Sequence, residues 1–465
     1  MAKVLLINPP WTKKGGNIWK SVSSCMPPHG LAILGALLEQ EGHQVQILDT
    51  HAERIALDEL QTVLTQRGKN VDFVGLTGST MTISYSYRTA EICKKAFPNA
   101  KTILGGVHAS SKPHEAAENP NIDFVVRGEG EYTFLELLNG KQLSDIRGLT
   151  YKERGRIIHN VARTWIKDLD GLPMPAYHLL PIDKYFPAVG SYKRLPAISM
   201  VTGRGCPGKC TFCYQPYGTL LRQRSPKKIF EEVQLLVEKY GVREICFYDD
   251  NFTTLKPRIR EFCQLLIDAD LDITWSCFSR VDWADLQLMK LMKKAGCHQV
   301  MFGVESGSQK ILDNIRKQTT LERIRHAVAI AKAANIDIRA AFMFGNPGET
   351  EETMQQTIDF ALELNPDIAM FNIATPNPGT QMYAWAEKEG LLSTENWEQY
   401  DIATPVLTLP TVRREQVLAY YRKAYRKFYL RPTYVWGRLA KLRTFADFRQ
   451  LLAGFRGIID AGLRS

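Results

Sequence analysis

Short apolar runs alternate with helix-like segments over residues 1–135. Two segments with apolar residues at helical spacing, 30–42 and 86–97, separate runs that are apolar on both faces. Such runs are typical of strands in a parallel sheet that helices cover on both sides. The predicted strands cover 3–10, 44–49, 71–80, 101–110 and 123–131. The pattern predicts a doubly wound α/β sheet, with a ligand crevice at the carboxyl ends of its strands.

The same alternation recurs six times over residues 196–390, with helical segments such as 226–241 and 320–336 between the strands. Six consecutive strand–helix units predict a partial (β/α)6 barrel of the TIM type rather than a flat sheet. The strands are predicted at 197–205, 243–251, 273–280, 298–306, 338–346 and 368–376. Polar and reactive side chains gather where these strands end, which is the face on which such barrels carry their active sites.

These patterns divide the chain into four parts. Residues 1–140 form the doubly wound, Rossmann-like sheet, and residues 196–390 form the partial barrel. Residues 141–195 are weakly patterned and contain a proline-rich stretch, so they are predicted to be a linker laid over the surface. Residues 391–465 are predicted to be a small, basic and aromatic helical segment.

The end of the chain holds the net charge of the protein. The 465 residues carry +10 overall, and residues 411–465 account for it with 13 Lys and Arg against three acidic residues. Helical stretches at 415–430 and 445–462 interleave these cations with aromatics. The segment either caps the barrel with a solvated face, binds an acidic substrate, or lies on an anionic membrane with its aromatics at the interface. Nucleic acid is not expected as a partner, because no recognised binding motif accompanies the charge.

The sequence indicates a cytoplasmic protein. Its first residues, MAKVLLINPPW, predict no signal peptide because prolines interrupt the short apolar run. No stretch reaches the roughly 18 to 20 apolar residues of a membrane span. Nine cysteines, an odd number and mostly isolated, suit a reducing compartment. If the basic segment does contact a membrane, the protein would lie peripherally at the inner face.

Three cysteines lie within eight residues of one loop, Cys206-x3-Cys210-x2-Cys213, directly after the first barrel strand. A structural zinc site normally closes with four ligands, and a disulfide framework needs an even set. Three thiolates on a four-iron cluster leave one iron free to bind another molecule. The alternatives are a partial zinc site and three unrelated core cysteines, and the strand-end location favours the cluster.

This loop resembles the CxxxCxxC signature of the radical S-adenosylmethionine superfamily, and the resemblance covers residues 196–390. It implies that the three cysteines ligate a 4Fe-4S cluster whose open iron chelates S-adenosylmethionine. Phe212 would support the adenine, while the segments FMFGNPGE and ATPNPG would line it. The resemblance places the following residues around S-adenosylmethionine, each with an alternative role as a barrel-mouth salt bridge or cap: Phe212, Asp249, Asp250, Arg280, Glu305 and Asn346.

The first part of the chain, followed by this barrel, resembles the cobalamin-binding radical enzymes. The matching segments are INPP, PPHGLAILGALLE, LTGST, ILGGVHAS and VVRGEGE. Small residues at the strand ends suit a large flat ligand that approaches the backbone. The resemblance places these residues near cobalamin: Asn8, Pro9, Ser79, Thr80, Gly106, Val107, His108, Gly128 and Glu129. The alternatives are a nucleotide-binding module, weakened by the lack of GxGxxG after the first strand, and a catalytically silent response-regulator-like fold.

The histidines depart from one type of cobalamin protein. Those of the methionine-synthase type carry Asp-x-His-x-x-Gly after the first strand, whereas this chain reads NPPWTKKGG there. The lower face of cobalt is therefore expected to lack a His ligand. His51 is expected at the surface, His29 in a turn or helix cap, and His108 in a hydrogen-bonding role.

The two resemblances together imply a C-methyltransferase that methylates an unactivated carbon of a small-molecule or lipid-like substrate. The enzyme would need a reducing electron donor such as a flavodoxin or ferredoxin. An oxidative or ring-forming cyclase of the tetrapyrrole type shares the architecture and is the alternative. A methylthiotransferase is disfavoured because only Cys25 and Cys93 precede the loop, and a cobalamin-sensing module would have no use for the three cysteines.

Overall fold

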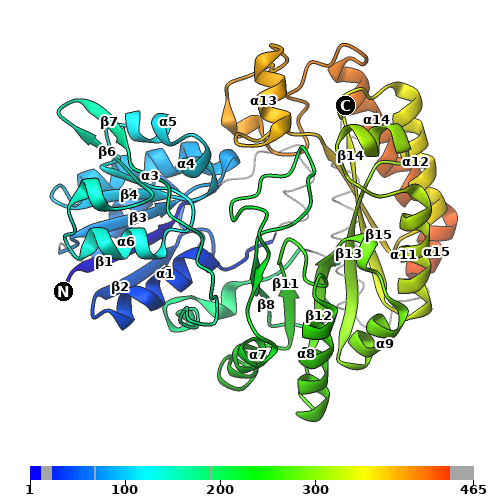
Figure 1. Ribbon diagram of the computed structural model, residues 1–465, viewed down its shortest axis with the longest axis horizontal. Coiled ribbons are helices and arrows are strands. Elements are labelled where there is room, and N and C mark those ends of the chain that lie inside the picture. Colours follow the sequence, from blue (N-terminus) through cyan, green and yellow to red (C-terminus); the bar gives the residue numbers. More distant parts are fainter. Residues whose placement is uncertain (12–23, 68–69, 189, 440–465) are drawn as a thin grey trace.

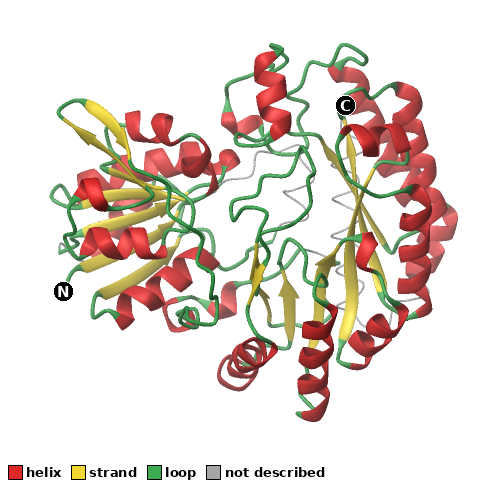
Figure 2. Cartoon of the chain, in the orientation of Figure 1, coloured by secondary structure: helices red, strands yellow, loops and turns green. Residues whose placement is uncertain are grey.

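A computed structural model describes the protein except for residues 12–23, 68–69, 189 and 440–465. Two sheets lie side by side, the first built from the start of the chain and the second from its middle (Figure 1). Helices flank the first sheet and follow the outer face of the second, which is curved (Figure 2). Both predicted classes, the doubly wound sheet and the partial barrel, are confirmed.

The first sheet has seven strands in the order β2-β1-β3-β4-β5-β6-β7, parallel from β2 to β5. Successive residues of β1 alternate between two hydrophobic clusters: Leu6 faces α1 and α6, whereas Leu5 faces α2 and α3. This alternation is why both faces of the sheet are covered. The strands and helices are β1 (Lys3–Asn8), α1 (His29–Gln40), β2 (Gln44–Asp49), α2 (Leu60–Gln66), β3 (Phe73–Thr77), α3 (Ile83–Ala96), β4 (Lys101–Gly105), α4 (Val107–Ser111), α5 (Pro113–Glu118), β5 (Phe124–Val126) and α6 (Glu131–Leu138).

The predicted linker 141–195 is more structured than expected. It contains β6 (Leu149–Glu153) and β7 (Arg156–His159), which extend the first sheet by antiparallel pairing onto β5. These strands are short, and Gly155 in the turn between them has a positive φ of 76°. Their sequences, LTYKE and RIIH, mix apolar and charged residues and form no continuous apolar run, so the pairing edge that β5 offers decides them.

The second sheet has six parallel strands in the order β15-β14-β13-β12-β11-β8, as predicted. The strands are β8 (Ala197–Met200), β11 (Glu244–Phe247), β12 (Thr274–Ser279), β13 (Cys297–Glu305), β14 (Asp337–Phe344) and β15 (Ile368–Ile373). The helices of this part are α7 (Pro226–Tyr240), α8 (Lys256–Asp268), α9 (Leu286–Lys294), α10 (Gln309–Asn314), α11 (Leu321–Ala333), α12 (Glu351–Leu364) and α13 (Gln381–Lys388).

The basic segment packs against the barrel. Its helices are α14 (Arg414–Tyr429) and α15 (Pro432–Leu439), and α14 lies along β15 and α12. The Tyr425 hydroxyl donates to the Phe371 carbonyl at 3.0 Å, and Phe428 is fully buried. Aromatics on this helix therefore belong to the core, as the cap interpretation requires. The predicted helix at 445–462 lies outside the described residues, and no helix in the described part is long and apolar enough to span a membrane.

Candidate functional site

The cysteine loop starts and ends on a two-residue antiparallel ladder, β9 (Gly203–Arg204) with β10 (Arg222–Gln223). Gly205 has a φ of +87°, and a Cβ there would lie 2.2 Å from the Leu220 carbonyl, so the loop requires glycine at this point. A Cβ on Gly208 would lie 3.4 Å from Cys206 Sγ and 4.0 Å from Cys210 Sγ. Two of the three thiols thus converge on Gly208, and their charges contribute to the raised pKa of the Cys213 thiol.

Cations face these thiols. Arg280 Nη1 lies 3.6 Å from Cys210 Sγ, and burial raises the pKa of Cys213 to about 12 while Lys317 acts in the opposite direction. Metal-bound sulfur is a thiolate, so its negative charge needs cations of this kind nearby. The loop therefore fits a cluster with three protein ligands.

Lys317 links two of the predicted S-adenosylmethionine residues to the loop. Its ammonium donates to Glu305 Oε1 at 2.7 Å and lies 6.0 Å from the centre of the Phe212 ring. Arg280 Nη2 donates to the Lys317 carbonyl at 2.7 Å. Burial lowers the pKa of Lys317, but Glu305 and Cys210 more than offset it and the pKa is raised. The fold thus brings Phe212, Arg280 and Glu305 together around a buried lysine that carried no signal in the sequence.

The two neighbouring aspartates differ in their surroundings. Asp249 is buried and accepts hydrogen bonds from the Thr202 backbone N–H at 2.5 Å and the Thr202 hydroxyl at 2.6 Å. It therefore joins the ends of β8 and β11, which is the structural alternative stated for it. Asp250 is exposed, and its charge contributes to the raised pKa of Cys206, so it lies beside the cysteine loop. Of the two, Asp250 is the one available to a ligand.

Asn346 is fully buried where β14 ends. Its side-chain amide donates to the Met343 carbonyl at 2.8 Å, and its backbone N–H donates to Glu349 Oε2 at 2.8 Å. Burial raises the pKa of Glu349 to about 8. In the described structure Asn346 stabilises the strand end and the turn that follows, and no bonding partner is found there for its Oδ1 atom.

A cavity of about 500 Å³ lies at the carboxyl ends of β1, β3, β4 and β5. Seven of its lining residues are glycines, and a Cβ on Gly105 would come no closer than 3.7 Å to other atoms. Its described walls therefore offer bare backbone and space, which fits a large flat ligand. The predicted cobalamin residues that line it are Asn8, Pro9, Ser79, Gly106, Val107, Gly128 and Glu129.

Two predicted cobalamin residues, Thr80 and His108, do not line this cavity. The His108 ring is fully buried, with Nδ1 3.3 Å from the Thr80 hydroxyl and Nε2 3.3 Å from Glu115 Oε1. Trp397, from the segment after the barrel, donates to the same Glu115 oxygen at 3.0 Å. His108 thus has the hydrogen-bonding surroundings expected of it, in a contact between the first domain and the segment that follows the barrel.

His29, the first residue of α1, lines the cavity and touches the barrel. Its Nε2 lies 2.9 Å from the Ser199 hydroxyl on β8, and burial lowers its pKa to about 4. The imidazole is therefore neutral at physiological pH. Tyr217 of the cysteine loop lines the same cavity. The candidate cobalamin cavity and the cysteine loop are thus directly adjacent.

Buried ion pairs fix this adjacency. Glu129 accepts from Arg222 Nη1 at 2.7 Å and from Arg204 Nη1 at 3.0 Å, and Arg204 Nη2 donates to Glu131 at 2.6 Å. Arg204 and Arg222 sit on the two strands that carry the cysteine loop, whereas Glu129 lies in the loop after β5 of the first sheet and Glu131 begins α6. Glu129 therefore lines the cavity and also holds the cysteine loop in place. The family resemblance predicted only the first of these roles.

Comparisons with known proteins agree with this two-part site. The model of the radical SAM superfamily matches residues 200–361, and that of the B12 binding domain matches residues 18–138. An uncharacterised methyltransferase of Pyrococcus horikoshii is 38% identical, over 92% of this chain and 93% of its own length. The anaerobic magnesium-protoporphyrin IX monomethyl ester cyclase of Rubrivivax gelatinosus is 30% identical, over 93% of this chain and 78% of its own.

Two solved structures share the fold. The cobalamin-dependent S-adenosylmethionine radical enzyme OxsB superposes with a TM-score of 0.77 at 17% identity, covering 99% of this chain and 72% of OxsB. The radical S-adenosylmethionine methyltransferase TsrM from Kitasatospora setae gives 0.72 at 16% identity, covering 98% and 99% of the two chains. At these identities the likeness concerns the fold alone.

Proposed function

Because this chain belongs to the cobalamin-dependent radical S-adenosylmethionine enzymes, with a 4Fe-4S cluster, S-adenosylmethionine and cobalamin as the implied cofactors, we propose that it is a C-methyltransferase. Its substrate would be a small molecule bound between the two cofactors. One observation carries the proposal: Tyr217 of the cysteine loop lines the same cavity as Ser79 and Gly106 of the first sheet. A methyl group at that cavity would need to move only a short way to a carbon beside the loop.

The cofactors, when bound, would supply an adenosyl radical that removes a hydrogen atom and a methyl group that replaces it. The chain would hold and orient them. Cys206, Cys210 and Cys213 would ligate the cluster, and Arg280 with Lys317 would offset the charge of the thiolates. Asp250 is exposed beside the loop, where it could accept hydrogen bonds from an amino group.

Cobalamin would lie over the bare backbone of Gly105 and Gly106. The neutral ring of His29 borders that cavity and is held by Ser199 of the barrel. Because its Nε2 atom is hydrogen-bonded to Ser199, His29 would hold the first domain and the barrel together beside the ligand. This role is additional to the turn or helix-cap role expected from the sequence.

The similar proteins support methyl transfer, and one of them supports cyclisation as a second candidate function. Besides the Pyrococcus horikoshii protein, similar proteins include the cytidylyl-2-hydroxyethylphosphonate methyltransferase of Streptomyces wedmorensis, 29% identical. The cyclase of Rubrivivax gelatinosus favours ring formation or oxidation as the alternative. Net methyl incorporation distinguishes the two. Both reactions would draw electrons from a donor such as a flavodoxin or ferredoxin.

The proposal is tested on protein purified without oxygen and reconstituted with iron, sulfide and hydroxocobalamin. We expect about four irons and one cobalt per chain, and 5′-deoxyadenosine when reductant and S-adenosylmethionine are added. The Cys210→Ala variant should lose iron and 5′-deoxyadenosine formation, whereas Cys93→Ala, a buried thiol of α3, should keep both. S-adenosylmethionine labelled on its methyl group should give labelled cobalamin and S-adenosylhomocysteine. Iron without cobalt, or 5′-deoxyadenosine without labelled cobalamin, would exclude the methyltransferase.

A further inference from the structure

Part of the concave face of the barrel sheet is not fully buried. On β14 and β15 the residues that face the helices, such as Phe342 and Phe371, are buried, whereas Arg339 and Met370 on the opposite face are only partly buried. Inner residues nearer the start of the sheet, such as Glu244 and Ser276, are buried, so a packed core fills only that end of the inner face. The partly buried inner residues include Tyr248, Phe278, Met301, Arg339 and Met370. They line what we call the inner hollow.

Arg339 of β14 reaches across this hollow. Its Nε atom lies 2.8 Å from the sulfur of Met370 on β15, and its side chain hydrogen-bonds to Tyr248, just beyond the end of β11. Two strands, β12 and β13, separate β14 from β11 in the sheet. Neighbouring strands are about 4.8 Å apart, so this contact has to cross the concave side. The guanidinium therefore lies within the hollow.

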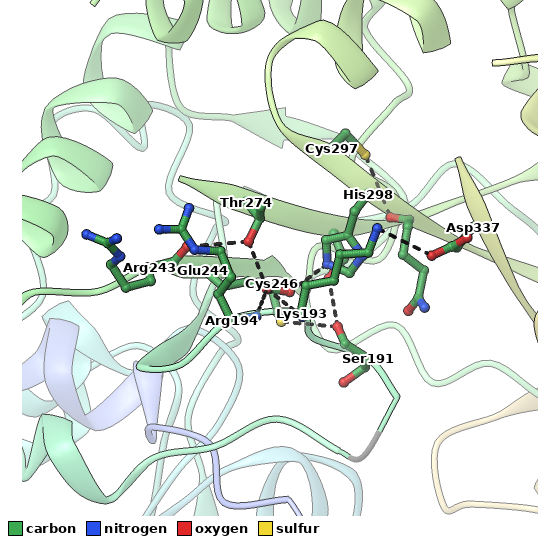
Figure 3. Close-up of polar contacts among 12 residues, drawn as sticks. Ser191, Lys193, Arg194, Arg243, Glu244, Cys246, Thr274, Cys297, His298 and Asp337 are labelled. Carbon is green, nitrogen blue, oxygen red and sulfur yellow. Dashed lines mark hydrogen bonds and ion pairs between the residues drawn. The ribbon is translucent and has the colours of Figure 1, made fainter. Parts of the chain in front are cut away.

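Residues 190–194, which precede β8, are hydrogen-bonded to β11, β12 and β13 near the starts of these strands (Figure 3). Glu244 accepts from the backbone N–H groups of Lys193 and Arg194 at 2.7 and 2.8 Å, and from His298 Nε2 at 2.6 Å. The Ser191 carbonyl accepts from the hydroxyl of Ser276 at 3.5 Å. A ligand would therefore reach Arg339 from the upper end, where the cysteine loop and Glu305 lie.

Arg339 has no acidic partner among the residues that the structure describes. The acid nearest to it on its own strand face, Asp337, pairs with Lys193 Nζ at 3.6 Å, as Figure 3 shows. Arg339 contacts the thioether of Met370 and the phenol of Tyr248, and the ring of Tyr248 in turn lies 4.8 Å from that of Phe278. A cation in such surroundings is stabilised when an anion joins it, and the planar guanidinium matches a carboxylate or phosphate group in particular.

We propose that the inner hollow binds the anionic group of the substrate, a carboxylate or a phosphate, through Arg339. The aromatic and thioether walls would hold an apolar part of the same molecule. The inference rests on the proposed function, since it gives the substrate class of that same site. Arg339 would then determine substrate specificity, a role separate from those of the cysteine loop and the candidate cobalamin cavity.

The test measures binding by titration calorimetry on the reconstituted holoenzyme, with benzoate, phenylphosphonate and neutral benzamide as probes. We expect the two anions to bind and benzamide to bind at least about tenfold more weakly, because a hydrogen bond to a charged group contributes roughly 1.5–3 kcal/mol. Arg339→Gln should weaken anion binding about tenfold or more, and Arg339→Lys should retain part of it. Arg325→Gln, which alters an exposed arginine of α11, is the matched control and should bind like the wild type.

Equal anion binding by wild type and Arg339→Gln would overturn the inference, as would a wild type that binds none of the three probes. Labelled methyl transfer to cobalamin is followed separately in the wild type. Arg339-dependent binding without that transfer would remove the methyltransferase and leave the anion site standing. Methyl transfer together with anion binding that does not depend on Arg339 would remove the anion site and leave the methyltransferase standing.

Discussion

The carboxylate of Glu129 is the centre of the contact that fixes the cysteine loop on the first sheet, and replacing it with glutamine should destabilise the protein strongly. The side chain is 1% exposed and that of Arg222 is 3% exposed. Glu129 accepts from Arg222 Nη1 with both oxygens, at 2.7 and 2.9 Å, and from the backbone N–H of Ile166 at 2.6 Å. The Glu129→Gln variant keeps the shape of the side chain, removes its charge and replaces one accepting oxygen with an NH2 donor.

The size of the effect follows from what each arginine retains. Arg204 still has Glu131 at 2.6 Å, so its charge stays paired. Arg222 would retain only the carbonyls of Ile166 at 2.7 Å and Tyr217 at 3.0 Å, together with the Trp165 ring. Breaking one buried ion pair by removing a partner costs about 3 to 5 kcal/mol. Because the carbonyls remain, we expect a loss near the lower end, about 3 kcal/mol.

The assay is urea unfolding of the metal-free chain, monitored by tryptophan fluorescence. The first unfolding transition is compared between variants, because a chain of this size need not unfold in one step. Glu91→Gln is the control, since Glu91 pairs with Lys95 in an exposed contact of α3 that solvent screens, so its loss should leave the stability almost unchanged. Adding Arg222→Met to Glu129→Gln should restore part of the stability, because no unpaired charge remains buried. A Glu129→Gln loss below about 1 kcal/mol would refute the reasoning.

Three further predictions concern the cavity and two buried titratable groups. Gly105→Val adds a side chain at the cavity wall, where a Cβ would come no closer than 3.7 Å to the protein atoms around it. Cobalamin retention in equilibrium dialysis should therefore fall at least about tenfold while the melting temperature stays within about 2 °C of wild type. The pKa of His29 is lowered to about 4. The neutral imidazole therefore contributes fully to the stability of the fold above pH 6.5, and this contribution should be lost as the pH falls toward 4. The free energy of unfolding of wild type should therefore fall by about 3 kcal/mol more than that of His29→Gln between pH 6.5 and 4. An equal fall in both proteins, measured by urea unfolding at each pH, would disprove this. The pKa of Glu349 is raised to about 8, so its contribution is complete below pH 4.5 and is lost as the pH rises through 8. Glu349→Gln should therefore gain stability over wild type across that range, by about 4 to 5 kcal/mol at its upper end, and a constant difference between pH 5 and 9 would contradict the assignment.

The sequence alone determined the positions of the main strands along the chain, their parallel direction and the location of the cysteine loop. These features depend on short-range information: a run apolar on both faces signals a strand covered by helices, and the spacing of Cys206, Cys210 and Cys213 lies within eight residues. The doubly wound sheet and the six-stranded partial barrel follow from such patterns repeated along the chain. The pairing of β6 and β7 did not follow, because those strands mix apolar and charged residues and form no continuous apolar run.

The contacts that assemble the site were decided only by the tertiary structure. His29 meets Ser199 across 170 residues, Glu129 meets Arg222 across 93, and Trp397 reaches Glu115 across 282. No local pattern encodes such pairs, since each depends on how the two sheets pack and on which strand edges face each other. The curvature of the second sheet likewise decides that Arg339 and Tyr248 meet across the hollow. A side chain's partner is set by this packing, which is why composition and spacing identified the chemistry of the loop but not the residues that hold it in place.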